Sequence, residues 1–105
     1  MLILKPHIFN KFHEISFGFI TKAGGNKNDL FHFNMSYNIG DKRENVVRNR
    51  AKFFEQLGLT NKSVAYQKQV HEDKISVIEN DGNCGESDAL ITTTKNLGLA
   101  ISTAD

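Results

Sequence analysis

The clearest periodic pattern lies in the middle of the chain, between Asp41 and Gly58. Apolar residues recur there at steps of three and four, which is the spacing of one face of an α-helix. Asp41 is predicted to cap the first turn in a capping box with Glu44, and Gly58 is predicted to close the helix. The predicted core face comprises Val46, Val47, Ala51, Phe53, Phe54 and Leu57. The predicted opposite face comprises Arg48, Asn49, Lys52, Glu55 and Gln56.

Short runs of β-branched and aromatic residues predict strands on both sides of this helix. The predicted strands are 15–21, 64–66, 74–78, 89–93 and 97–102. Gly, Asn and Asp dominate 23–29 and 80–86, which are predicted loops, and 30–39 is predicted to be irregular or a short strand. One main helix with five or six short strands predicts an α+β domain, whose sheet needs a covering layer.

Composition narrows the class of protein. The chain has 105 residues, 39% hydrophobic and 24% charged, with a formal net charge of +1. This length allows one small domain, and the balanced charge argues against a nucleic-acid binder. No apolar run reaches the roughly 18 residues of a transmembrane helix. The single cysteine, Cys84, forms no intrachain disulfide and is expected to be inert; a cytoplasmic location is expected.

Two side chains are candidates for a functional role because of their residue type and their position in the sequence. His71 lies between two predicted strands, where a neutral imidazole binds a metal or moves a proton; a surface or capping role is the alternative. Arg50 directly precedes a predicted core position, so it is expected to point partly inward, where a charge needs a partner or a ligand. Its guanidinium is suited to a two-pronged grip on phosphate.

Five short motifs follow one another along the chain. They are FITKAGG at 19–25, FNMSYNIGD at 33–41 with Val46 and Asn49-Arg50 behind it, QVH at 69–71, SDALIT at 87–92 and TAD at 103–105. Their order and spacing resemble the bacterial laccase-domain proteins of the YfiH type, in which the patterns are F-T-T-R-x-G-G, L-N-L-G-x-x-x-G-D-x-x-x-x-V-x-x-N-R, Q-V-H-G, A-D-A-L-V-T and T-A-D-C. Lys22 replaces the arginine of the first pattern, and Glu72 replaces the glycine of the third.

The resemblance covers residues 17–105 and implies a layered α/β sandwich around mixed sheets. The chain is expected to be the N-terminal portion, about half, of a single laccase-like domain. The family's chemistry implies a zinc or copper site with two histidines and a cysteine. His71 takes the place of the first histidine. The cysteine is expected directly after Asp105, and the second histidine further on.

The family was first described as multicopper polyphenol oxidases and is now regarded as purine nucleoside phosphorylases that also deaminate adenosine. The resemblance therefore implies purine nucleosides and phosphate as partners. Arg50 is the matched residue best suited to phosphate, and Asn34 to a hydrogen bond with nucleoside or phosphate. In the structural alternative, Arg50 pairs with a carboxylate and Asn34 braces a turn. Without two of the metal ligands, the isolated chain is expected to be inactive.

Two other functions compete with this one. The chain could be a non-catalytic binding or assembly module that associates through its apolar C-terminal strand, because an unpaired strand edge invites association. A copper-dependent phenol oxidase ranks last, since several coppers need more than the four histidines of this chain.

Overall fold

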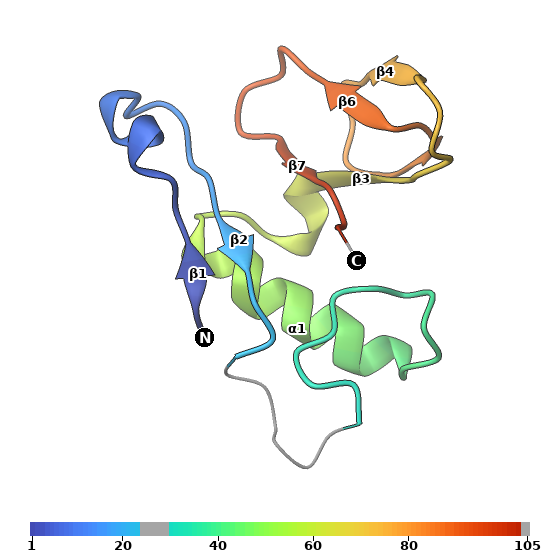
Figure 1. The fold of residues 1–105 in the computed structure, drawn as a ribbon. Helices are drawn as coiled ribbons and strands as arrows, with labels where there is room; N and C mark the ends of the chain where they lie inside the picture. Colours follow the sequence, from blue (N-terminus) through green and yellow to red (C-terminus); the bar gives the residue numbers. More distant parts are fainter. Residues whose placement is uncertain (24–29, 104–105) are drawn as a thin grey trace. The chain divides into compact units, whose positions relative to one another are not determined.

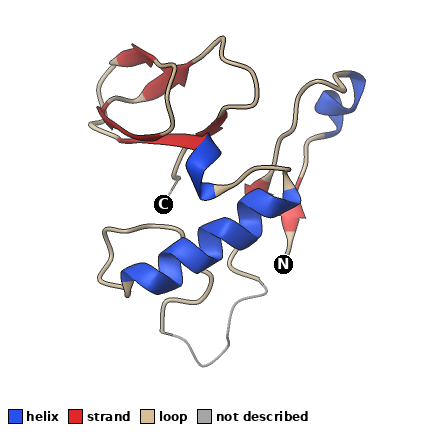
Figure 2. Ribbon diagram, turned by 180° about the vertical axis from the view of Figure 1, so that it is seen from behind, coloured by secondary structure: helices blue, strands red, loops and turns tan. Residues whose placement is uncertain are grey.

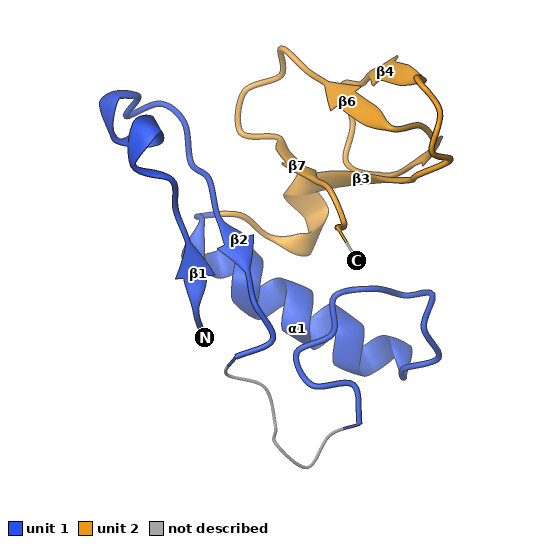
Figure 3. Ribbon diagram, in the orientation of Figure 1, with its two compact units in different colours: residues 1–58 blue, residues 59–105 orange. Residues whose placement is uncertain are grey.

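The computed structural model describes residues 1–23 and 30–103 and divides the chain into two compact units, Met1–Gly58 and Leu59–Asp105 (Figure 3). The predicted loop at 23–29 and the last motif, at 103–105, fall largely outside the described residues. The first unit holds the long helix, and the second holds a parallel sheet (Figure 1). The described residues include no helix that is both long and apolar enough to cross a bilayer.

In the first unit, helix α1 (Arg43–Gln56) begins later than predicted (Figure 2). Its N-cap is Lys42, and no side chain caps it. The backbone of Lys42 is extended, so Asp41 lies one residue too early to reach the first-turn N–H groups. The predicted capping box with Glu44 is therefore wrong. Gly58 closes the helix as predicted: it adopts a φ of +74°, and its N–H donates to the carbonyl of Glu55.

The buried face of α1 matches the predicted one at Val46 and Phe54 and differs from it at other positions. The buried residues are Val46, Asn49, Arg50 and Phe54. Val47 and Ala51 are exposed, contrary to the prediction, and Asn49 is buried although it was assigned to the opposite face. The difference at Asn49 has a polar cause: Asn49, like Arg50, donates a side-chain hydrogen bond to a backbone carbonyl of the preceding loop.

The start of the chain forms a small antiparallel ladder. Strand β1 (Ile3–Leu4) pairs with β2 (Phe19–Ile20), and a 3-10 helix, η1 (His7–Lys11), lies between them. The strand predicted at 15–21 is thus reduced to its last part. Residues 30–39 contain no strand and are irregular, as predicted.

The second unit is built from parallel strands. The 3-10 helix η2 (Asn61–Ser63) leads into β3 (Val64–Lys68), which lies between β5 (Gly82–Glu86) and β7 (Gly98–Ala100). A separate parallel pair joins β4 (Ile75–Val77) and β6 (Ala89–Ile91). All four strands predicted after the helix are present. Within residues 1–23 and 30–103, one α-helix together with parallel and antiparallel strands confirms the predicted α+β class.

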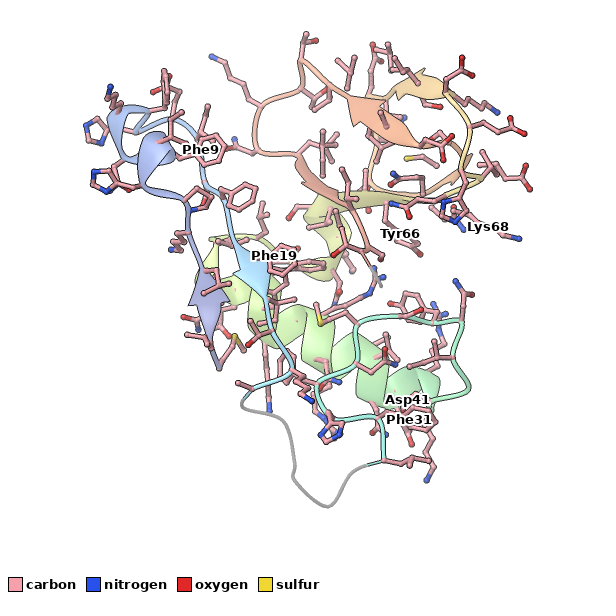
Figure 4. All side chains as sticks on the ribbon, viewed as in Figure 1. Phe9, Phe19, Phe31, Asp41, Tyr66 and Lys68 are labelled. Carbon is pink, nitrogen blue, oxygen red and sulfur yellow. The ribbon has the colours of Figure 1, made fainter. Side chains whose placement is uncertain are left out.

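Strand β5 overturns the loop predicted at 80–86. It pairs in parallel with β3, and the register shifts between Tyr66 and Lys68, which Figure 4 labels. Gly82 and Gly85 adopt φ values of +91° and +84°, which other residues rarely reach. Composition predicted a loop here because local propensity is blind to a strand partner.

Gly98, at the start of β7, faces packed side chains. A Cβ added there would lie 2.7 Å from Leu59 Cδ1 and 3.1 Å from Val64 Cγ2. We expect Gly98→Ala to lower the free energy of unfolding of the second unit by about 1–3 kcal/mol, because Val64 is buried and β-branched. Denaturant unfolding measures this, with Thr93→Ala, at an exposed position, as the control. Equal midpoints for the two variants would contradict the expectation.

Candidate functional site

The three strands of the β5-β3-β7 sheet run parallel, so their carboxyl ends meet at one edge. Residues 69–71 leave β3 there, residues 87–88 leave β5, and residues 101–103 leave β7. The Gln69 Nε2 donates to the carbonyl oxygen of Ser102 at 2.9 Å, and this bond links the segment after β3 to the segment after β7. The predicted metal ligand His71 therefore lies at the edge of a parallel sheet where ligand sites commonly form.

His71 has an unusual backbone and an available side chain. Its φ is +57°, in the left-handed region that residues with a Cβ rarely adopt. The residue is exposed, and its imidazole makes no hydrogen bond to any other residue in 1–23 and 30–103. The side chain is thus accessible to a ligand, whereas the backbone N–H is hydrogen-bonded to another residue.

The group that holds this backbone is the carboxylate of Asp88. Its Oδ1 accepts hydrogen bonds from the N–H groups of Val70 (2.9 Å) and His71 (2.7 Å). Its Oδ2 accepts from Glu72 (2.9 Å) and Lys74 (3.4 Å). Desolvation by burial works to raise the pKa of Asp88, but the four N–H groups outweigh it and hold the pKa below its ordinary value of 3.8. The carboxylate is therefore charged when it grips the turn.

Asp88 lies in the SDALIT motif at 87–92, and nothing in that motif indicated this role. Its partners are backbone N–H groups of a segment distant in sequence, and no side-chain pattern announces such a contact. The one signal in the sequence was its place directly before the strand predicted at 89–93.

A metal site needs several ligand side chains close together. In the part of the chain that the structure describes, no three His, Cys, Asp or Glu side chains gather to hold an ion. Zinc usually takes about four ligands. His71 is of a residue type that zinc accepts as a ligand, and no two further such side chains join it among the described residues. Cys84 is not near such a cluster; its thiol donates to the carbonyl of Gly82 at 3.5 Å.

Asn34, in the first unit, is the centre of a hydrogen-bonded loop. Its Oδ1 accepts from the N–H of Ser36 at 2.8 Å, and its Nδ2 donates to the Ser36 carbonyl at 2.8 Å and to Asp41 Oδ2 at 3.3 Å. Its own carbonyl accepts from Asn49 Nδ2 at 2.8 Å. The Asn34 amide thus shapes the loop that precedes α1.

Arg50 is buried beside the same loop, with 7% of its surface exposed. Its Nε donates to the carbonyl of Met35 at 2.8 Å. Its guanidinium carbon lies 4.4 Å from the centre of the Tyr37 ring, and that of Arg43 lies 4.7 Å from the same centre. Two cations at one aromatic ring make this a positively charged cluster. The predicted inward direction of Arg50 is confirmed. Arg50 and Asn34 belong to one cluster, whereas His71 belongs to the other unit.

Asp41 ties this loop to the N-terminal end of α1 (Figure 4). Desolvation by burial works to raise the pKa of Asp41, but hydrogen bonds from Asn45, Asn34 and the Lys42 N–H, with the charge of Arg48, hold the pKa below 3.8. The carboxylate therefore favours the folded state at any pH above 3.8, and this contribution is lost as the pH falls through the lower folded pKa.

Below about pH 4, we expect the free energy of unfolding of the first unit to fall less steeply with decreasing pH in Asp41→Asn than in the parent chain. The free energy of unfolding, followed by the far-ultraviolet signal of α1 between pH 7 and pH 2, measures this. Glu44→Gln removes an exposed carboxylate from the same helix and serves as the control. The expectation would be contradicted if Asp41→Asn lost as much free energy of unfolding with falling pH as the parent chain does.

The chain is similar in sequence to several known proteins. A purine nucleoside phosphorylase of Corynebacterium glutamicum is 36% identical over 92 residues, which are 83% of this chain and 37% of that protein. Purine nucleoside phosphorylases of Mycobacterium bovis and Mycobacterium tuberculosis are each 35% identical over 88 residues, 81% of this chain and 35% of the relative. The chain thus spans little more than a third of the length of these relatives. No solved structure matches.

A family model described as multi-copper polyphenol oxidoreductase laccase matches residues 16–105, which is nearly the range over which the five motifs were found. The family expected from those motifs is confirmed, and this chain belongs to the multi-copper polyphenol oxidoreductase laccase family.

Proposed function

We propose that this chain forms the N-terminal portion of one laccase-like domain, a layered α/β sandwich, of a metal-dependent purine nucleoside phosphorylase. The relatives that carry this name support the reaction class. In the structure, the proposal is supported mainly by the exposed imidazole of His71, which lies on a turn whose backbone N–H groups are hydrogen-bonded to the Asp88 carboxylate.

The reaction sets the chemical needs of the site. In phosphorolysis an oxygen of inorganic phosphate forms a bond to C1′ of the ribose while the bond from C1′ to the purine nitrogen breaks. The electron pair of that bond leaves with the purine, which takes up a proton, and ribose 1-phosphate is the second product. The enzyme must hold the phosphate close to C1′ and offset the charge that develops as the base departs.

Arg50 is the proposed phosphate-binding residue. Its Nε bond to the Met35 carbonyl and its stacking on Tyr37 hold the guanidinium in one place, which lowers the entropy lost when an anion binds. Arg43, on the same ring, adds positive charge. A charged group held in place in this way stabilises a bound phosphate better than a mobile surface lysine does.

Asn34 is proposed to hydrogen-bond the nucleoside or the phosphate. Its amide is already bonded to Ser36 and Asp41, so it would exchange one of these bonds for the ligand. The contact from Nδ2 to Asp41 Oδ2, at 3.3 Å, is the longest of the three and is the one expected to give way.

His71 is the proposed metal ligand, joined by the cysteine that the family resemblance places directly after Asp105 and by a later histidine. The bond from Gln69 to Ser102 keeps the segment that follows β7 beside the segment that leads to His71, which favours such a convergence. When bound, zinc or copper would supply Lewis-acid chemistry, including the activation of water for the accompanying deamination of adenosine.

The test uses the full-length protein that carries this chain, supplied with inosine or adenosine. With phosphate present, we expect free base and ribose 1-phosphate in equal amounts, and no free base without phosphate. Inosine formed from adenosine in the absence of phosphate would report the deaminase. A metal-loaded protein that releases neither base nor inosine would refute the proposed function.

The alternative function, an assembly module, is favoured by one observation. Strand β7 lies at the edge of its sheet, and Leu99 and Ile101 on and beside it are exposed. Sedimentation of this chain over a range of concentrations separates the two functions, because the assembly module predicts a shift to larger species that Leu99→Lys abolishes.

A further inference from the structure

The turn between β3 and β4 is built around one carboxylate that reaches it from the far end of β5. The contact runs in both directions. Asp88 accepts from four N–H groups of residues 70–74, and the N–H groups of Asp88 and Ala89 donate to the carbonyl of Lys74 at 2.8 and 3.2 Å. Both oxygens of the carboxylate and the backbone around it are thus committed to this turn.

Two of the four bonds lie on the two sides of a single Cα atom. The His71 N–H belongs to the peptide plane before that atom, and the Glu72 N–H belongs to the plane after it. Because each peptide unit is planar, holding both planes fixes φ and ψ of His71 together. The direction of the bond from Cα to Cβ, and with it the starting direction of the imidazole, follows from those two angles.

The φ angle of His71 is positive, which is unfavourable for a residue with a Cβ. At a φ of +57° the Cβ of an L-residue crowds the backbone carbonyl, so a free turn would favour another conformation. Nothing in the imidazole itself offsets this, since it has no hydrogen-bond partner in the described part of the chain. The left-handed conformation therefore depends on the groups that hold its two peptide planes.

We infer that Asp88 is a positioning residue, which aims the His71 imidazole by holding the peptide planes on both sides of it. This inference rests on the proposed function, in which His71 is a metal ligand. It assigns Asp88 no contact with metal or substrate. Its contribution is to keep the ligand preorganised, so that metal binding does not have to order the turn.

The isosteric variant Asp88→Asn tests the inference. An asparagine can still accept from Val70 and His71 through its oxygen, but its NH₂ group would face the N–H groups of Glu72 and Lys74, donor against donor. The plane after His71 is then released. Asp73→Asn is the matched control, since it removes the same charge from an exposed residue of the same turn.

Nuclear magnetic resonance of this chain provides a readout that a merely structural role would not move. We expect the scalar coupling and carbon shifts that report φ of His71 to leave the left-handed range in Asp88→Asn, with the signals of β3 and β7 unchanged. We expect hydrogen exchange of the Glu72 amide to become about tenfold faster or more. Asp73→Asn should match the parent chain in all of these.

The parent chain alone gives a second measurement, in case Asp88→Asn fails to fold. Couplings across the hydrogen bonds, from the amide nitrogens of His71 and Glu72 to the Cγ of Asp88, are expected in the folded chain. Their absence would overturn the inference, as would an Asp88→Asn chain in which φ of His71 and exchange at Glu72 stay unchanged.

The metal-binding experiment uses the full-length protein with zinc or copper, each added alone, and a competing chelator. We expect Asp88→Asn to weaken zinc binding by about 10–100-fold and Asp73→Asn to leave it unchanged. Equal zinc affinity in Asp88→Asn and the parent protein would overturn the inference. If the parent protein binds no zinc or copper, the proposed function fails, and the resonance measurements still decide whether Asp88 sets the direction of His71.

Discussion

Arg50→Met is expected to lower the rate of phosphorolysis by the full-length protein on the order of 10²–10³-fold, because it removes the charge proposed to hold phosphate. It should also lower the free energy of unfolding of the first unit by about 1–3 kcal/mol, since the Met35 carbonyl loses its charged donor. The methionine fills a similar volume, so the fold should persist. Steady-state rates at several phosphate concentrations, with circular dichroism as a check of folding, measure both effects.

Arg48→Met is the matched control for this loss. Arg48 lies on the exposed side of the same helix, where its Nη2 donates to Asn45 Oδ1 at 2.9 Å. The same substitution there removes the same charge without touching the Tyr37 cluster. We expect less than a twofold change in rate, as is usual for a surface charge. If the two variants lose activity equally, Arg50 has no special role in binding phosphate.

His71→Gly is expected to separate activity from stability. Removing the imidazole should abolish metal retention and activity in the full-length protein. Glycine adopts a positive φ without the roughly 1–2 kcal/mol that a Cβ costs there, but it loses about 0.5–1 kcal/mol more backbone entropy on folding. The free energy of unfolding of the second unit should therefore stay level or rise by up to about 1.5 kcal/mol. Metal content after dialysis and denaturant unfolding measure the two quantities.

His32→Gly provides the same change outside the proposed site. His32 is an exposed histidine in the first unit with a φ of +54°, so the backbone effect should be similar. Metal content and activity should remain at the level of the parent protein. A His71→Gly protein that keeps its metal, or a His32→Gly protein that loses it, would remove His71 from the proposed metal site.

The helix shows what periodicity can and cannot predict. Spacing of three and four placed α1 correctly and found its end at Gly58. It placed Val46 and Phe54 on the buried side correctly but missed Asn49, because the predicted stripe was drawn through apolar residues alone. Asn49 and Arg50 lie on the buried side, where their side chains bond the carbonyls of Asn34 and Met35. Such partners lie far along the chain, so no local pattern reveals them.

The site was predictable to a similar degree. The motifs identified His71, Arg50 and Asn34 as candidates. Arg50 points inward as predicted, although Ala51, the predicted core position beside it, is exposed. The support that Asp88 gives to His71 did not follow from the motifs. It arises only when parallel pairing of β3 and β5 brings the exits of both strands to one edge, and the glycine-rich composition of β5 had predicted a loop.

Parallel pairing in the second unit also sets the order of events during synthesis. Strand β3 pairs with β5 and β7 and not with β4, its neighbour in sequence. As the chain leaves the ribosome, β3 emerges before both partners, and its pairing with β7 must wait until Gly98–Ala100 have followed. Helix α1, with only local hydrogen bonds along its backbone, needs no such wait. The second unit is therefore expected to fold late, and a nascent chain paused before β7 would expose an unpaired strand to aggregation and to chaperones.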